Sequence, residues 1–129
     1  MGKLNVKKLF EDCVKLCKEY SNEVILNYRS LANDCEIIIK DCNGEMSTIG
    51  IFIIGNKLHL QYIYLTEILQ GKGLCTKLLN FFETYNNHLS DIIVDTVLNP
   101  ILEKHLKKLG YTNTDINGFG LDYVKKFNN

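Results

Sequence analysis

The sequence has one proline, no long apolar run and no excess of charge of either sign in its 129 residues. Because Pro100 is the single proline, the chain has no proline-rich linker, and nothing else marks a boundary, so we expect one domain over residues 1–129. No stretch approaches the roughly 18 apolar residues of a membrane span, which rules out a transmembrane protein. Its 15 basic and 15 acidic side chains cancel, whereas nucleic-acid binding normally shows as excess lysine and arginine. We therefore expect neither a membrane nor a nucleic acid as partner.

Targeting signals and a cysteine framework are also missing. The N-terminus leads into charged residues rather than the apolar core of a secretory signal, and Val6 stands where N-myristoylation needs serine or threonine. Five cysteines, an odd number, favour free thiols and a cytoplasmic protein. The spacing of Cys13, Cys17, Cys35 and Cys42 matches no common zinc pattern. We interpret them as small buried apolar side chains and expect no metal site.

The period of the apolar residues changes along the chain. Helical spacing, three and four residues apart, predicts helices over residues 6–20 and 74–85. Strands joined by tight turns, which form an antiparallel meander, are predicted over residues 36–41, 47–54 and 58–65. The first of these turns is Asn43-Gly44, a two-residue hairpin turn that requires positive φ. Residues 23–32 fit either a strand or a helix.

The C-terminal third shows clearer boundaries. After a strand over residues 91–97, Asn99 is the expected N-cap of a helix with Pro100 at its first position. Gly110 is expected to end that helix in the left-handed conformation. Two last strands, residues 111–116 and 121–127, flank turn residues Asn117-Gly118.

The order of elements predicts the fold class. The third strand of the meander, the helix after it and the next strand form a βαβ crossover, which requires those two strands to run parallel in one sheet. We predict an α/β protein of the α+β type, with a mixed, mostly antiparallel twisted sheet and helices on both faces. Ligands in such sheets favour the carboxyl end of the strand that feeds the helix, which points to residues 65–75.

That segment contains Gly71 and Gly73 where a helix begins. Glycines allow a tight turn and close approach by a ligand. The unpaired first N–H groups of a helix and the positive end of its dipole suit a phosphate, to which Lys72 and Lys77 would add charge and Thr76 a hydroxyl. The spacing is that of neither a P-loop nor a dinucleotide-binding turn, because residue 76 is not glycine and no Gly-Lys-Ser/Thr follows at the required distance.

The segment Gln70–Cys75 resembles the Arg/Gln-x-x-Gly-x-Gly/Ala signature of the GNAT superfamily, the acyl-CoA-dependent N-acetyltransferases. Residues 99–111 resemble a second stretch of that family, Asn-Pro-x-Ala-x-x-x-Tyr-x-x-x-Gly-Phe. The resemblance is clear over residues 58–111 and weak before residue 36. It implies a fold whose fourth and fifth strands are parallel and splay apart.

The resemblance also implies a cosubstrate and its contacts. Acetyl-CoA would be bound at the end of the fourth strand, Tyr64 and Leu65, with the backbone of Leu65 at the thioester carbonyl and the pantetheine arm. Asn99 would contact the pantetheine. The pyrophosphate would be held by the backbone amides of Gln70, Gly71, Lys72, Gly73, Leu74 and Cys75.

Two positions depart from the family pattern. Cys75 replaces a glycine or alanine, a small change. Leu106 stands where many members carry a tyrosine that protonates the departing thiolate, and leucine has no proton to donate.

Amine acetylation benefits from a general base that keeps the amine neutral. The resemblance points to alternate positions before Leu65, here His59 and Gln61, which would share one face of a strand. Histidine has an ordinary pKa of about 6.5, suited to a base, and Gln61 would orient a water. Asp95, on the strand that would flank the cleft, is a second candidate.

These observations favour an acetyl-CoA-dependent N-acetyltransferase in which a primary amine attacks the thioester directly in a ternary complex. The acceptor is a small-molecule or protein amine that the sequence does not specify, and the oligomeric state is equally open. Two alternatives stay open. One, favoured by Leu106, is an acyl-CoA-binding module of the same fold with little or no catalysis; the other is a structural domain that binds no CoA.

Overall fold

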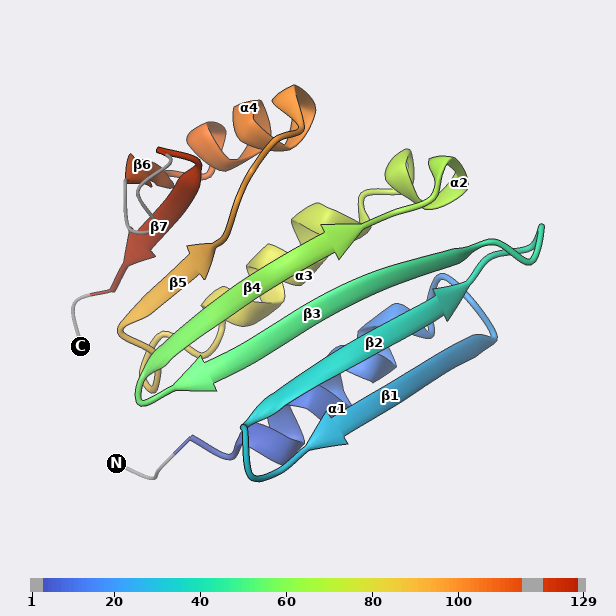
Figure 1. Ribbon diagram of the computed structural model, residues 1–129, viewed down its shortest axis with the longest axis horizontal. Coiled ribbons are helices and arrows are strands. Elements are labelled where there is room, and N and C mark those ends of the chain that lie inside the picture. The colour runs from blue at the N-terminus through green and yellow to red at the C-terminus, as the bar shows by residue number, and fades with distance from the viewer. Residues whose placement is uncertain (1–3, 115–119, 128–129) are drawn as a thin grey trace.

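The computed structural model describes residues 4–114 and 120–127 (Figure 1). Within this part of the chain, one 7-stranded sheet has the strand order β1-β2-β3-β4-β5-β7-β6. The strands are β1 Glu23–Arg29, β2 Asp34–Lys40, β3 Met46–Ile54, β4 Lys57–Tyr64, β5 Asp91–Val94, β6 Thr112–Thr114 and β7 Asp122–Lys126. The helices are α1 Val6–Cys17, the single turn α2 Glu67–Gln70, α3 Leu74–Glu83 and α4 Pro100–Lys108.

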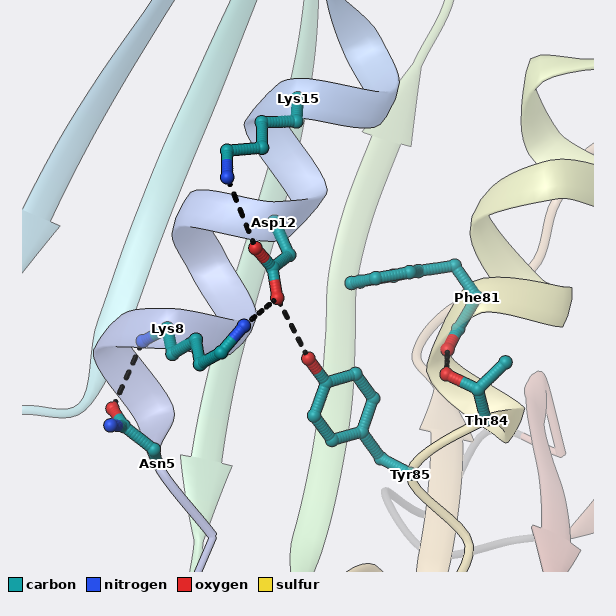
Figure 2. Close-up of polar contacts among 7 residues, drawn as sticks. All are labelled: Asn5, Lys8, Asp12, Lys15, Phe81, Thr84 and Tyr85. Atoms are coloured by element: carbon teal, nitrogen blue, oxygen red, sulfur yellow. Dashed lines mark hydrogen bonds and ion pairs between the residues drawn. The ribbon is translucent and has the colours of Figure 1, made fainter.

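Helix α1 forms because its start is capped and one side is apolar. The Asn5 side chain accepts a hydrogen bond from the Lys8 amide at 3.0 Å, which satisfies one of the unpaired first amides. Asp12 lies on the polar side, where it accepts hydrogen bonds from Lys8 Nζ at 2.8 Å and from the Tyr85 hydroxyl at 3.2 Å (Figure 2). Since Tyr85 follows α3, this contact links the first helix to the third. The residues that α1 buries are Leu9, Phe10, Cys13, Val14 and Cys17.

The ambiguous segment at residues 23–32 is a strand over Glu23–Arg29, so the antiparallel meander comprises β1 to β4. Burial alternates along it residue by residue, which is the pattern of a strand with one face covered. Helix α1 ends at Cys17, three residues earlier than predicted.

The Asn43-Gly44 hairpin differs from the expected two-residue turn. Gly44 has a φ of +81°, but Asn43 is not among the residues with positive φ. The connection runs from Asp41 to Glu45, and the Asp41 amide donates to the Glu45 carbonyl at 2.9 Å. The side chain of Asp41 holds this longer loop, because it accepts hydrogen bonds from the amides of Asn43 and Glu45.

The sheet is mixed and mostly antiparallel, and β4 and β5 run parallel, so the predicted class of fold is confirmed. The two strands pair only over residues 57–60 and 91–94, and the last link is the Asp95 amide on the Leu60 carbonyl at 3.1 Å. Beyond it β4 continues to Tyr64, whereas the chain after β5 turns towards α4 (Figure 1). The strands therefore separate at Asp95.

Specific contacts join the helices to one another and to the sheet. Helix α1 contacts β1, β2 and α3, and Thr76 in α3 contacts His105 in α4. Lys125 of β7 reaches both Glu83 of α3 and the Leu109 carbonyl after α4. Helices α1, α3 and α4 thus form one layer on a single face. The cause is connectivity: two right-handed crossovers that progress in the same direction place their helices on the same side.

The main core lies between this helix layer and the sheet, and Leu58, Leu60 and Ile92 are fully buried in it. Cys13, Cys17 and Cys35 are buried there as small apolar side chains, whereas Cys42 is exposed. No group of three metal-ligating side chains occurs among the described residues. In the same part of the chain, no helix has the length and apolar character needed to cross a membrane.

Candidate functional site

A cavity of about 510 Å³ lies at the carboxyl end of β4, between the start of α3 and helix α4. It is the place that the strand order predicts for a ligand. Residues from both sequence motifs line it, although the motifs are far apart in the chain: Gln70, Gly71, Gly73 and Cys75 come from the first and Asn99 from the second. Leu65, at the end of β4, also lines it. Tertiary structure therefore brings the two motifs together around one space.

Three residues expected at the cofactor do not line the cavity with their side chains. Leu74 is fully buried in the core, where it packs α3 on the sheet. Tyr64 is 63% exposed, and Lys72 is exposed. Their expected role was a backbone one at Leu74 and Lys72, so the position of their side chains does not bear on it.

The glycine turn has the geometry of an anion site. Gly73 is the N-cap of α3 with a φ of +77° and offers no side-chain cap, and the first helical bond runs from the Lys77 amide to the Gly73 carbonyl at 3.1 Å. The amides before Lys77 have no acceptor within the helix. They stand at the positive end of the helix dipole, so this end of the cavity favours negative charge.

Gln70 supports the turn from within. Its side-chain Nε2 donates a hydrogen bond to the Leu65 carbonyl at 2.8 Å, which ties the end of β4 to the last residue of α2. Asn99 caps α4, with its Oδ1 accepting from the Ile101 amide at 2.8 Å. The side chains of both polar residues thus shape the walls of the cavity.

Thr76 and His105 form a contact that the sequence did not reveal. The Thr76 hydroxyl, expected to face phosphate, is hydrogen-bonded to Nε2 of His105 in α4. Both residues line the cavity. The available signal was helical spacing, because His105 lies four residues after Ile101 and three after Leu102, which also line it. Leu106, one position further, is fully buried in the core instead.

Lys77, expected to add charge at the phosphate, contacts the segment after α1 instead. Lys77 Nζ lies 3.7 Å from a carboxylate oxygen of Glu19 and 5.5 Å from the Tyr20 ring centre, so its charge is partly neutralised by the segment after α1.

Burial raises the pKa of the Cys75 thiol to about 11. This thiol is therefore protonated at neutral pH.

Two candidate catalytic residues meet where β4 and β5 separate. His59 Nδ1 lies 3.6 Å from Asp95 Oδ1, and their side chains are 17% and 15% exposed. The His59 ring stacks on Phe52, with ring centres 4.3 Å apart and planes inclined by 8°. Burial raises the pKa of Asp95, as does the nearby Asp122, while the His59 ring opposes the shift. An imidazole held between an aromatic ring and a carboxylate suits proton transfer.

Gln61 is not part of this pair. The pairing of β3 with β4 shifts between Gly50 and Ile51, which face Tyr62 and Leu60, so Gln61 is the extra residue of a β-bulge. The alternation that would place Gln61 beside His59 breaks at this point, and the Gln61 side chain is exposed. The role of Gln61 in orienting a water stays a prediction.

Three solved structures share this fold. The paia N-acetyltransferase from Thermoplasma acidophilum, in complex with coenzyme A, has 16% sequence identity and a TM-score of 0.54, over 98% of this chain and 97% of that one. An acetyltransferase of the GNAT family from Staphylococcus aureus Mu50 has 12% identity and a TM-score of 0.53, over 99% and 96%. Nourseothricin acetyltransferase has 11% sequence identity and a TM-score of 0.51, and the match covers 74% of this chain and 66% of that protein.

Sequence comparison alone finds none of this, since no protein-family model and no curated protein sequence matches the chain. The structural neighbours establish that the chain has the GNAT acetyltransferase fold. That conclusion agrees with the resemblance of the glycine turn and of the segment after Asn99.

Proposed function

We propose that this protein is an acetyl-CoA-dependent N-acetyltransferase. The observation that carries the proposal is the cavity that joins the Gln70–Cys75 turn to Asn99 beside the point where β4 and β5 separate. Coenzyme A, which is bound by one neighbour of the same fold, has a pyrophosphate for the turn and an extended arm for the separated strands. Apolar side chains, Ile63 and Leu65, line the wall along which that arm would lie.

In the proposed reaction, the backbone amides at the start of α3 bind the pyrophosphate, and no covalent intermediate forms on the protein. The acceptor nitrogen attacks the thioester carbonyl carbon, an N–C bond forms and the C–S bond breaks. His59 accepts the proton that the nitrogen loses, and Asp95 stabilises the resulting imidazolium. Coenzyme A leaves as a thiolate, which takes up a proton from water. Leu106, apolar and fully buried, does not supply that proton.

The acceptor is a primary amine on a small molecule or a protein. The alternative is an acyl-CoA-binding module that transfers poorly, and the buried Leu106 favours it because the usual proton donor is missing. The two candidates differ in turnover and agree in affinity for the cosubstrate.

Calorimetric titration with acetyl-CoA and with CoA tests the shared part, and turnover with a panel of amines separates the two candidates. Micromolar affinity with turnover supports the enzyme, and the same affinity without turnover supports the binding module. Failure of the intact protein to bind either molecule would refute both and leave the Gln70–Cys75 turn a structural feature.

A further inference from the structure

Three polar residues are buried where the β2–β3 connection meets the segment after β4. Asp41 is 8% exposed, Ser47 0% and Thr66 4%. The Thr66 hydroxyl donates to Asp41 Oδ2 at 2.7 Å, and the Thr66 amide donates to the Ser47 hydroxyl at 2.8 Å. Buried polar groups are costly unless they are hydrogen-bonded, so these contacts hold the three segments in one arrangement.

Asp41 is itself held on the hairpin side. Its Oδ1 accepts hydrogen bonds from the Asn43 amide at 2.9 Å and from the Glu45 amide at 3.1 Å. The two carboxylate oxygens of Asp41 therefore have different partners. Oδ1 closes the loop between β2 and β3, and Oδ2 accepts a hydrogen bond from Thr66, 25 residues away in sequence. The β2–β3 connection and α2 lie at the same end of the sheet (Figure 1).

Thr66 lies between two residues of the cavity wall, Leu65 and Glu67, and is the N-cap of α2. Gln70, at the other end of α2, donates to the Leu65 carbonyl. Thr66 therefore connects the short segment that leads into Gly71 and Gly73 to strands of the sheet that do not otherwise touch the cavity.

We propose that Asp41 and Ser47, acting through Thr66, are positioning residues that set the place of the glycine turn and so determine the affinity for the CoA moiety. This inference rests on the proposed function for the identity of the ligand. A group 25 residues from Thr66 in sequence, outside the cavity, would thus control binding by geometry.

A charge effect would have the opposite sign. Asp41 is an anion, and Lys72 in the turn is close enough to interact with its charge. If only charge mattered, Asp41→Asn would remove a repulsion from the phosphate and strengthen CoA binding. Positioning predicts weaker binding when the Thr66 contacts are removed without any change of charge.

The test uses Thr66→Val, which keeps the shape of the side chain and removes the hydroxyl. We expect the Kd for CoA and the KM for acetyl-CoA to rise roughly tenfold, the size of a lost buried hydrogen bond. The kcat at saturating acetyl-CoA and the KM for the amine should stay unchanged, because the reacting groups are not moved once the cosubstrate is bound. Ser47→Ala should also raise the Kd for CoA. Thr66→Ser, which keeps the hydroxyl, should bind CoA as tightly as the unchanged protein.

Ser21→Ala is the matched control. Its hydroxyl donates to the carbonyl of Lys40, the residue before Asp41, and makes no contact with Thr66. It should leave CoA affinity unchanged. Folded Thr66→Val protein with the affinity of the unchanged chain, or Asp41→Asn protein with stronger binding, would overturn the proposal.

Hydrogen exchange separates this inference from the proposed function. The amides of Leu69 and Gln70, which donate to the Thr66 carbonyl at 3.0 Å, should exchange faster in Thr66→Val and not in Ser21→Ala. Faster exchange in a protein that never binds CoA would refute the proposed function and support the positioning role of Asp41. Unchanged exchange would refute the positioning role itself, whatever the chain binds.

Discussion

His59 and Asp95 face each other across the last paired positions of two parallel strands, with Nδ1 and Oδ1 3.6 Å apart. His59 belongs to β4 and Asp95 follows β5, and the strands separate immediately beyond them. The pair therefore stands where the proposed thioester would be exposed to an acceptor. The stacking of Phe52 on the imidazole keeps the planes of the two rings nearly parallel.

Replacement of His59 by glutamine should lower kcat about 100-fold, the lower end of what general base catalysis contributes. The affinity for CoA should not change, since His59 does not line the cavity. His88→Gln, a histidine in the connection between α3 and β5, is the control. A His59→Gln variant with an unchanged kcat would exclude His59 as the general base.

Replacing Asp95 or Asp41 by asparagine should change the melting temperature at pH 7 in opposite directions, because the pKa of Asp95 is raised in the folded protein and that of Asp41 is lowered. Burial raises the pKa of Asp95, so its ionised form is disfavoured in the folded state, and the stability it contributes below the ordinary pKa of about 3.9 is lost as pH rises through the folded value. At pH 7, Asp95→Asn should therefore melt at a higher temperature than the unchanged protein, although it turns over more slowly.

Asp41 provides the matched comparison. The Thr66 hydroxyl lowers the pKa of Asp41, as do the amides of Asn43 and Glu45, so its contribution is present above the ordinary value and is lost as pH falls through the folded value. Asp41→Asn should lower the melting temperature at pH 7. Thermal melts between pH 7 and 3 should show that the difference in melting temperature between each variant and the unchanged protein becomes smaller as the pH falls. A lower melting temperature for Asp95→Asn at pH 7 would contradict the assignment of the shift.

Gly73 and Gly55 allow backbone strain to be separated from occupation of the site. Both have positive φ, +77° and +59°, and an added Cβ would meet nothing within 4 Å at either. Alanine at either position should cost about 1–2 kcal/mol of unfolding free energy, because side chains disfavour this conformation. Tryptophan at residue 73 should abolish CoA binding, whereas Gly55→Trp, in the β3–β4 connection, should not. Equal loss of binding in both would show that strain alone is responsible.

Cys75 should be dispensable as a nucleophile. Its pKa of about 11, raised by burial, leaves almost no thiolate at neutral pH, and direct attack by the amine needs none. Cys75→Ala should keep most of the turnover, and mass spectrometry should find no acetylated protein when acetyl-CoA is added without an amine. A variant that binds CoA normally yet does not turn over would reverse this conclusion.

Leu106 should matter for stability and not as a proton donor. It is fully buried, so Leu106→Ala should lower the free energy of unfolding by about 2–5 kcal/mol, and the fully exposed Leu31 serves as the control. Leu106→Tyr should destabilise the fold by overpacking without raising kcat. Denaturant unfolding and initial rates measure the two effects. A faster Leu106→Tyr enzyme would mean that residue 106 reaches the cavity.

Local rules predicted much of the fold. Asn99, Pro100 and Gly110 mark the ends of α4 as expected, with Asn99 capping its first amides and Gly110 at a φ of +93°. Capping and left-handed glycine depend only on neighbouring residues, so the sequence suffices for them. The order of elements likewise required the parallel pairing of β4 and β5.

Other features depend on register and packing between distant segments. The bulge at Gln61 arises where β4 pairs with β3, and nothing within β4 marks it. The choice between His105 and Leu106 for the cavity depends on how α4 is rotated against α3. Both were missed because neighbouring residues on one element look equivalent until a partner element selects a face.

The sequence by itself determined the class of fold, the ends of α4 and the glycine turn, since periodicity, capping and backbone freedom are properties of short segments. Only the tertiary structure decided that the helices share one face, that His59 meets Asp95, and that Asp41 is bonded to Thr66. Each of these depends on contacts between residues far apart in the chain, whose distances are set by strand register and by the burial of polar groups that must find partners.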